Sequence, residues 1–132
     1  MNTPDTNKRI VAEYVHAFNQ GDSVALRKLF TPDAVISGVL GWAEIERAIP
    51  VWRELHEAFA IELTIDELVA EGDLVAARYT ERGKSVGSFR GGAVTGKSYE
   101  LVAMEWFHLR AGKITRRWGA RDSAAQSRQM GL

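Results

Sequence analysis

The chain has 132 residues, of which 45% are hydrophobic and 26% charged, and only 3 are proline. A chain of this length buries roughly two-thirds of its unfolded surface, and the composition lacks the polar bias of disordered proteins, so we predict one folded domain over residues 1–132. The 17 basic and 17 acidic residues cancel. This balance argues against nucleic acid as a partner, because phosphate binding needs concentrated positive charge.

The chain contains no cysteine, which excludes disulfides, thiolate metal sites and a cysteine nucleophile. No apolar run approaches the ~20 residues that span a bilayer. The first 21 residues lack a basic start followed by an unbroken apolar stretch. We therefore expect a cytoplasmic protein with no membrane partner.

The first element is a predicted helix that starts at Thr3 and Pro4 and stops at Gly21. Its apolar residues share one helical stripe: Ile10, Val11, Tyr14, Val15 and Phe18. A short second helix follows, capped by Asp22 or Ser23 and ended by the sequence Thr-Pro-Asp at 31–33. Residues 34–37 fit a short strand.

A third helix is predicted from apolar residues that recur in steps of three and four: Trp42, Ile45, Ile49, Trp52, His56 and Phe59. Pro50 should kink or split this helix, because proline lacks the backbone N–H that the ladder uses. The period changes to two after Ala60, where Ile61, Leu63 and Ile65 alternate with polar residues. That alternation predicts a strand.

Further strands are predicted over residues 74–82, 98–110 and 113–122, separated by turns at 71–73 and 111–112 and by a glycine-rich loop. Residues 123–132 form a tail with a possible helical turn. Three helices followed by an antiparallel meander predict an α+β fold in which the helices cover one face of a curved sheet.

The strand over residues 98–110 is apolar on both faces. Leu101, Ala103 and Phe107 lie on one face, and Val102, Met104 and Trp106 lie on the other. Antiparallel sheets usually leave one face in water. The second apolar face therefore predicts a homodimer formed through the convex surface of the sheet.

Several segments carry a resemblance to a known family: Leu68–Ala76, Arg78-Tyr79, Thr95-Gly96-Lys97, Gly112-Lys113-Ile114 and Trp118-Gly119-Ala120-Arg121-Asp122. They resemble the SnoaL-like polyketide cyclases, or ester cyclases, of the nuclear transport factor 2-like superfamily. That superfamily also contains ketosteroid isomerase and limonene epoxide hydrolase. The resemblance implies a cone, with three N-terminal helices packed on a curved, mixed but mostly antiparallel sheet. It also implies a closed apolar pocket between the helices and the concave sheet face.

Strand alternation indicates which charged groups could enter that pocket. It groups Asp122 with Ile114 and Trp118, on the face opposite Arg117. It also groups Arg78 with Leu74 and Ala76, and Glu105 with Leu101, Ala103 and Phe107. We therefore expect Arg78, Glu105 and Asp122 to converge in one pocket. Burial and a neighbouring cation shift a carboxyl pKa in opposite directions, which would hold one carboxyl protonated and one ionised.

The resemblance assigns catalytic roles to four residues. Asp122 falls on the aspartate that ends the family's Trp-x-x-x-Asp sequence and acts as general acid/base in the cyclases. Arg78 falls near the pocket arginine of the epoxide hydrolases. Tyr14 matches a helix tyrosine that donates to the oxyanion in ketosteroid isomerase, and Glu105 falls near that enzyme's protonated carboxylic acid.

Each of these residues also has a purely structural interpretation. Asp122 could end a strand and cap the tail, Arg78 could pair with Glu62 or Asp122, and Glu105 could face solvent. Tyr14 could be a core residue with a satisfied hydroxyl. The expected substrate-binding residues are aromatic or lie on the helical stripes: Phe18, Trp52, His56, Phe107 and Trp118.

No metal or cofactor is expected. The three histidines at 16, 56 and 108 have no metal-ligand spacing, and Gly96-Lys97-Ser98 enters a strand and not a helix, so it is no phosphate loop. The chain also departs from its resemblance. Ile36, Ser37 and Gly38 stand where many family members place a histidine or carboxylate. Thr80, Ser85 and Ser88 replace further functional residues.

The first functional hypothesis is a cofactor-free enzyme of the cyclase, isomerase or hydrolase type. It would transfer protons at Asp122, helped by Glu105, Arg78 and Tyr14, on a small hydrophobic carbonyl or polycyclic substrate. The alternative is a small-molecule-binding protein of the same fold that has lost the chemistry. A third possibility is a domain that serves dimerisation alone.

Overall fold

A computed structural model describes residues 3–38 and 41–131. The helices are α1 (Pro4–Gln20), α2 (Ser23–Lys28), α3 (Ile45–Phe59) and α4 (Ser123–Met130). The strands are β1 (Phe30–Gly38), β2 (Gly41–Glu44), β3 (Glu62–Glu71), β4 (Leu74–Lys84), β5 (Ser98–Arg110) and β6 (Lys113–Arg121). The predicted α+β class is confirmed, and a fourth, C-terminal helix adds to the three predicted ones.

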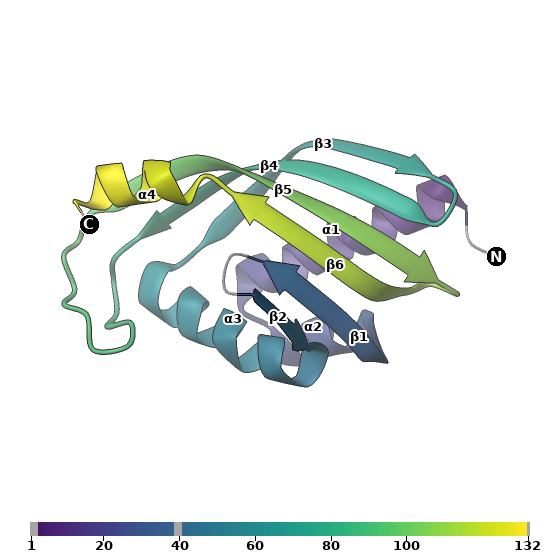
Figure 1. Ribbon diagram of the computed structural model, residues 1–132, viewed down its shortest axis with the longest axis horizontal. Coiled ribbons are helices and arrows are strands. Elements are labelled where there is room, and N and C mark those ends of the chain that lie inside the picture. Colours follow the sequence, from purple (N-terminus) through teal and green to yellow (C-terminus); the bar gives the residue numbers. More distant parts are fainter. Residues whose placement is uncertain (1–2, 39–40, 132) are drawn as a thin grey trace.

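The six strands form one curved sheet in the order β2-β1-β6-β5-β4-β3 (Figure 1). Strands β3 to β6 form an antiparallel meander, as the sequence predicted. Strand β1 joins the other edge of this meander by pairing parallel to β6, and β2 pairs antiparallel to β1. The sheet is therefore mixed but mostly antiparallel.

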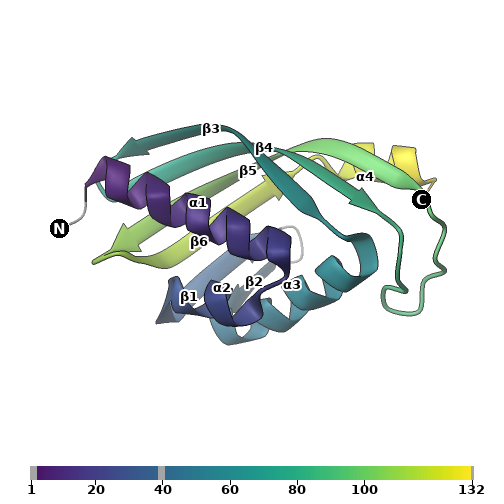
Figure 2. The same ribbon diagram turned by 180° about the vertical axis from the view of Figure 1, so that it is seen from behind.

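Helix α1 begins and ends at the residues that the sequence indicated. Thr3 caps it by accepting a hydrogen bond from the backbone N–H of Thr6 at 3.1 Å. Gly21 ends it with a φ of 66°, in the left-handed region that glycine adopts most easily. Figure 2 shows α1 lying across one face of the sheet, with α2 and α3 beside it. Its buried stripe, which includes Val11, Tyr14 and Phe18, packs into the core.

Helix α3 starts later than predicted and runs unbroken through Pro50 to Phe59. Trp42, which continues the helical spacing in the sequence, instead lies in β2 opposite Ser37 of β1, and its side chain is 71% exposed. The prediction that Trp42 belongs to this helix was therefore wrong. The pairing of β2 with β1 takes precedence over a local period of three and four residues.

Strand β1 begins at Phe30 and is longer than predicted. The Thr-Pro-Asp segment at 31–33 lies inside this strand and does not form a separate turn after α2. Its register against β6 is irregular between Phe30 and Val35, where Pro32 has no N–H to offer the ladder. Within the described residues, every helix is too short or too polar to cross a membrane.

Candidate active site

A cavity of about 640 Å³ lies between α1, α3 and the concave face of the sheet. Its walls are mainly apolar and aromatic. They include Phe18 from α1, Trp52 and Phe59 from α3, Ile61 just before β3, and Leu63 in β3. The cavity extends to α4 and to the loop between β4 and β5. Its size and apolar walls are typical of a site for a small organic molecule.

A cluster of polar side chains from α1, β5 and β6 lies inside this apolar enclosure. Glu105 Oε2 is 2.9 Å from Arg117 Nε, and both side chains are about nine-tenths buried. The hydroxyl of Tyr14 donates a hydrogen bond to the same oxygen at 3.1 Å. Arg117 also donates to the backbone carbonyl of Ser37 and lies over the ring of Trp52. The carboxylate thus has the counter-charge that a buried ion requires.

The tyrosines of the cluster are held in their protonated form. Burial, and then the neighbouring Glu105 carboxylate, raise the pKa of Tyr14 above its ordinary value. The same two causes raise the pKa of Tyr79 well above its ordinary value. Burial is the largest influence on Arg117 and would lower its pKa, but the Glu105 carboxylate together with Tyr14 and Tyr79 outweighs burial, and the pKa is raised. Both phenols are therefore hydrogen-bond donors and Arg117 is a permanent cation.

Three polar atoms of the cluster are buried without a hydrogen-bond partner among the described residues: Glu105 Oε1, the Tyr79 hydroxyl and Arg117 Nε. Arg117 Nε has the Glu105 carboxylate as its ion-pair partner, which leaves Glu105 Oε1 and the Tyr79 hydroxyl. Both residues line the cavity. One is an acceptor and the other a donor, and both the charge of Glu105 and its side-chain contact with the hydroxyl help to raise the pKa of Tyr79. The two groups therefore face each other without forming a hydrogen bond of ordinary geometry. Buried polar groups are nearly always paired, so this vacant acceptor and donor point to a ligand.

The sequence places Arg117 in the cavity by means of a β-bulge. Leu109 of β5 pairs with Ile114, but the next residue, His108, pairs with Arg116, so Thr115 is an extra residue in β6. An extra residue reverses which side chains face the core. Ile114 is buried before the bulge, and Arg117 is buried after it. Without the bulge, Trp118 would face the core instead.

Gly119 completes this arrangement by leaving room for the guanidinium group. A Cβ atom at this position would lie 2.3 Å from Arg117 Nη1 and 3.5 Å from Glu105 Oε2. Because real Cβ atoms essentially never make contacts this short, a side chain at position 119 would force the guanidinium group of Arg117 to shift beside Glu105.

A second polar group lines the cavity nearer to α4. Arg121 Nε lies 3.1 Å from Glu81 Oε1, and Arg121 Nη2 pairs with Glu81 Oε2 at 2.5 Å. The hydroxyl of Tyr99 donates to that oxygen as well, also at 2.5 Å. Burial and the Glu81 carboxylate raise the pKa of Tyr99 above its ordinary value. Glu81 therefore holds Arg121 in a fixed, bidentate geometry.

Four of the residues named from the sequence contribute to the cavity. Tyr14 and Glu105 line it and bond each other, and Phe18 and Trp52 form part of its wall. The ring of Phe107 lies behind Tyr14 in an edge-on contact at 5.3 Å, fully buried in the core and outside the lining. These positions follow the helical stripe and the strand alternation.

The expected convergence of Arg78 and Asp122 with Glu105 is not found. Asp122 is exposed and caps α4, where its Oδ1 accepts a hydrogen bond from the N–H of Ala125 at 3.0 Å. Arg78 lies on the convex face, with a side chain 45% exposed and an ion pair to Asp66 at 3.8 Å. Asp122 lies where its structural interpretation put it, at the end of β6 as the cap of the following segment. Arg78 forms an ion pair as its structural interpretation expected, but its partner is Asp66 and neither Glu62 nor Asp122.

Trp118 and His56 also lie away from the cavity lining. Trp118 is the cross-strand neighbour of the exposed Trp106, and it contacts the ring of His108 and the guanidinium of Arg116. The bulge explains this placement, since it turns Trp118 to the convex side. His56 packs against the end of α1, where a Cβ on Gly21 would lie 2.7 Å from its ring.

Sequence reasoning missed four residues of the site: Tyr79, Glu81, Arg117 and Arg121. The first two lie on the same face of β4 as the buried Val75 and Ala77, at every second position. That alternation was a usable signal for them. The sequence analysis assigned Arg117 and Arg121 to the opposite face of β6, because no sequence pattern indicates the bulge at Thr115. Among the described residues, no three His, Cys, Asp or Glu side chains gather to hold a metal ion.

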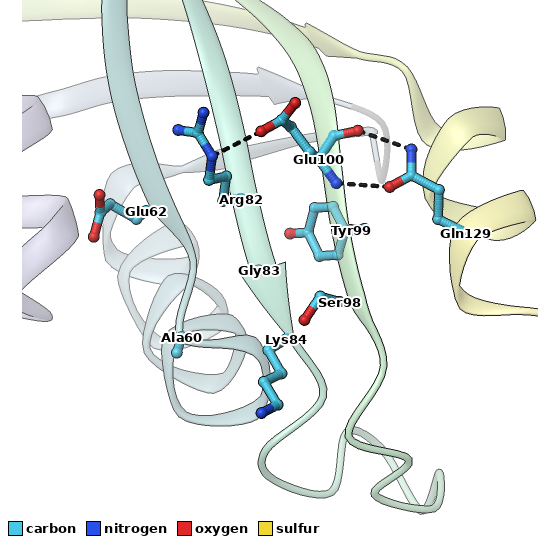
Figure 3. A pocket seen from close by; sticks show the side chains of 9 residues that line it. All are labelled: Ala60, Glu62, Arg82, Gly83, Lys84, Ser98, Tyr99, Glu100 and Gln129. Carbon is cyan, nitrogen blue, oxygen red and sulfur yellow. Dashed lines mark hydrogen bonds and ion pairs between the residues drawn. The ribbon is translucent and has the colours of Figure 1, made fainter.

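A second hollow, of about 510 Å³, lies at the end of the sheet below the Tyr99 ring. Its polar groups pair with one another (Figure 3): Arg82 bonds Glu100 at 2.7 Å, and Gln129 bonds the backbone of Glu100 twice. These side chains are largely exposed. No vacant buried donor or acceptor was found in this hollow among the described residues, so the enclosed cavity is the stronger candidate site.

Comparison with known proteins identifies a matching family and several similar solved structures. The model of the SnoaL-like domain family matches residues 11–117. Among solved structures, IdmH from Streptomyces antibioticus, provisionally described as a polyketide cyclase, is 29% identical, with a TM-score of 0.84 over 96% of this chain and 99% of that one. A search of the curated proteins found no match at a significant level.

Two further structures share the fold at lower identity. AclR from Streptomyces galilaeus, provisionally described as a hydroxylase, is 23% identical, with a TM-score of 0.87 over 98% of this chain and 84% of that one. A nuclear transport factor 2-like protein of unknown function from Cytophaga hutchinsonii is 21% identical, with a TM-score of 0.69 and full coverage of both chains. Both show the fold alone.

Proposed function

We propose a function from one premise, that the chain belongs to the SnoaL-like domain family, whose model matches most of its length. The proposed function is proton transfer next to the carbonyl of a small, largely apolar molecule, as in a polyketide cyclase or isomerase. The description of IdmH as a cyclase agrees with it. The fold alone hosts many reactions, so the proposal depends on the site.

A single observation carries the proposal: the vacant acceptor Glu105 Oε1 and the vacant donor Tyr79 Oη, both buried in one apolar cavity. A ketone or ester with a hydrogen on its α-carbon offers the complement of this pair. Its oxygen accepts from Tyr79, and its C–H faces Glu105. Such a pairing would satisfy both orphan atoms.

In the proposed reaction, Glu105 Oε1 removes a proton from the α-carbon. The C–H electron pair forms the enolate, and the negative charge develops on the carbonyl oxygen. The Tyr79 hydroxyl donates to that oxygen, and this contact strengthens as the charge grows. In a cyclase reaction, the enolate carbon attacks a second carbonyl of the same molecule, the C=O π bond of that carbonyl breaks, and its oxygen takes the proton from Glu105. In an isomerase reaction, Glu105 returns the proton to another carbon of the conjugated enolate. Arg117 and Tyr14 hold the carboxylate in place throughout.

This mechanism moves the acid/base role from Asp122 to Glu105, because Asp122 caps α4 outside the cavity lining. It keeps Tyr14 as a hydrogen-bond donor, but with Glu105 as its acceptor. Tyr79 takes the contact to the substrate oxygen. Arg117 supplies the counter-charge that the sequence analysis sought in Arg78.

The proposal is tested with 2-tetralone, an apolar bicyclic ketone with acidic α-hydrogens. In D₂O, the protein should speed the exchange of these hydrogens for deuterium, followed by ¹H NMR. Glu105→Gln should lower the protein-catalysed rate by roughly 100-fold or more, the usual contribution of a general base. Tyr79→Phe should lower it as well, because the enolate oxygen loses its donor.

Asp122→Asn is the matched control, because asparagine caps a helix as well as aspartate does. This variant should keep the wild-type exchange rate. If Asp122→Asn abolished exchange and Glu105→Gln did not, the acid/base role would return to Asp122. If 2-tetralone bound to the wild-type protein but exchanged its α-hydrogens only at the uncatalysed rate, the chain would be a binding protein of the same fold.

A further inference from the structure

The cavity lining carries more positive than negative charge. Its charged residues are four arginines and two glutamates: Arg47, Arg90, Arg117, Arg121, Glu81 and Glu105. Each glutamate is paired with a lining arginine, Glu105 with Arg117 and Glu81 with Arg121. The remaining two arginines are exposed. Arg90, on the loop between β4 and β5, pairs with Glu54 at 3.5 Å, which leaves Arg47 on α3 as the cation without an ion pair in the described lining. An anionic group in the cavity would therefore meet an excess of cations.

Arg121 is built to bind such a group. Glu81 occupies its Nε and Nη2, and Tyr99 completes the partners of Glu81. This leaves Nη1 for another acceptor. The Arg121 side chain is 24% exposed, compared with 9% for Arg117, so it lies nearer the open end of the cavity. A guanidinium held on one edge by a carboxylate loses little entropy when it binds a second one.

The two polar groups are spaced for one elongated ligand. Glu105 pairs across the sheet with Gly119, and Arg121 lies two residues further along β6. Since a strand rises about 3.4 Å per residue, these positions are about 7 Å apart along the sheet. Ala103 lies opposite Arg121 on the same face of the sheet, so a small, apolar side chain lines the cavity between the two polar groups. A rigid bicyclic molecule spans this distance.

We propose that the substrate is an amphipathic carboxylate: its ketone meets Glu105 and Tyr79, and its carboxylate binds Arg121 Nη1 at the open end of the cavity. Arg47 attracts the carboxylate from the rim. The ketone end of this assignment rests on the proposed function. The carboxylate end rests on the lining charges and on the geometry of Arg121.

The test compares two probes by isothermal titration calorimetry, 6-acetyl-2-naphthoic acid and its methyl ester, which differ in charge and in one methyl group. The acid should bind at least about tenfold more tightly than the ester, the effect of one charge-assisted contact. The affinity of the acid should fall between 50 and 300 mM NaCl, while that of the ester stays constant. Equal affinities, or a salt effect shared by both probes, would overturn the proposal.

The variant that isolates Arg121 is the double substitution Glu81→Gln with Arg121→Gln. It removes one charge of each sign, so no buried charge is left alone and the net charge is unchanged. It should reduce the preference for the acid to less than about threefold, and leave the ester affinity unchanged. A preference that survives in the folded double variant would contradict the role of Arg121.

Arg47→Gln is a second test of the carboxylate site. Arg47 is exposed, so its substitution does not disturb the core. It should reduce the affinity for the acid alone, by roughly two- to threefold, through loss of long-range attraction. Arg53→Gln is its control, because Arg53 is exposed on the same helix but outside the lining. An equal effect of both variants would mean that only the net charge of the protein matters, and it would contradict a specific role of Arg47 at the rim of the cavity.

The carboxylate site and the proposed function fail separately. Glu105→Gln should abolish exchange of 2-tetralone and keep the preference for the acid over the ester. If the wild-type protein catalysed exchange but showed no preference for the acid over the ester, the carboxylate site would be rejected and the proposed function would stand.

Discussion

At the scale of single residues, the polar cluster shows how far a sequence pattern reaches. Glu105 shares a strand face with Leu101, Ala103 and Phe107, so its face could be predicted, and Tyr14 follows from the helical stripe of α1. Their direct hydrogen bond, over a separation of 91 residues, could not be predicted. It depends on the distance between α1 and β5, which the packing of the whole core sets.

The buried tyrosines predict how stability depends on pH. Tyr14, Tyr79 and Tyr99 have raised pKa values in the folded protein, because of burial and then of the neighbouring carboxylates. An unfolded tyrosine loses its proton near pH 10, so the unfolded state gains stability above this pH and the folded state does not. The free energy of unfolding should be unaffected by this term below pH 9.

Between pH 10 and 11, each of these tyrosines should lower the free energy of unfolding by about 1 kcal/mol. Urea denaturation at the two pH values measures the loss. Tyr79→Phe should reduce the loss by about one-third of the tyrosine contribution, since one of three groups is removed. An unchanged loss in this variant would show that Tyr79 titrates normally in the folded protein.

At the scale of elements, β6 shows why part of the site could not be predicted. The order and bounds of the meander follow from alternation and glycine turns, and β5 begins and ends at the predicted residues. The bulge at Thr115 reverses the faces of β6, so that alternation counted from Ile114 put Arg117 on the wrong side. The extra residue can be recognised only from the pairing of β6 with β5, because a bulge is defined by backbone hydrogen bonds and has no local sequence pattern here.

Gly119→Ala tests how β6 positions Arg117. The added methyl group would overlap Arg117 Nη1, so the guanidinium must leave Glu105 and the buried carboxylate loses its counter-charge. We expect a fall of about 3 kcal/mol in the free energy of unfolding. Catalysed exchange of 2-tetralone should fall by roughly 10- to 100-fold.

Gly38→Ala is the control for this prediction. A Cβ on Gly38 would lie 3.5 Å from the same Arg117 atom, an ordinary contact. This variant should keep both stability and exchange close to those of the wild type. Similar losses in the two variants would mean that Gly119 has no special role beside Arg117.

At the scale of the whole molecule, the fold follows from the sequence more completely than the site does. Three amphipathic helices before a meander predict the layers, and burial of the helical stripes fixes the concave face. The convex face keeps large exposed apolar side chains on β5: Val102, Met104 and Trp106, each about half exposed. A sheet face of this kind is typical of an interface between subunits.

We therefore predict a homodimer through the convex face. Light scattering at micromolar concentration should give twice the monomer mass, and Trp106→Glu should give the monomer mass, because a charge would be buried at the interface. Lys84→Glu, which changes an exposed residue at the end of β4, is the control and should remain dimeric. A monomer mass for the wild type would contradict the prediction.

The central claim, that Glu105 and Tyr79 form the reactive pair, is tested most directly by a crystal structure with 2-tetralone bound. The account predicts the carbonyl oxygen within about 3.2 Å of Tyr79 Oη and an α-carbon within about 3.5 Å of Glu105 Oε1. A ketone bound in the cavity with its carbonyl turned away from both residues, or bound only in the hollow beside Tyr99, would contradict it.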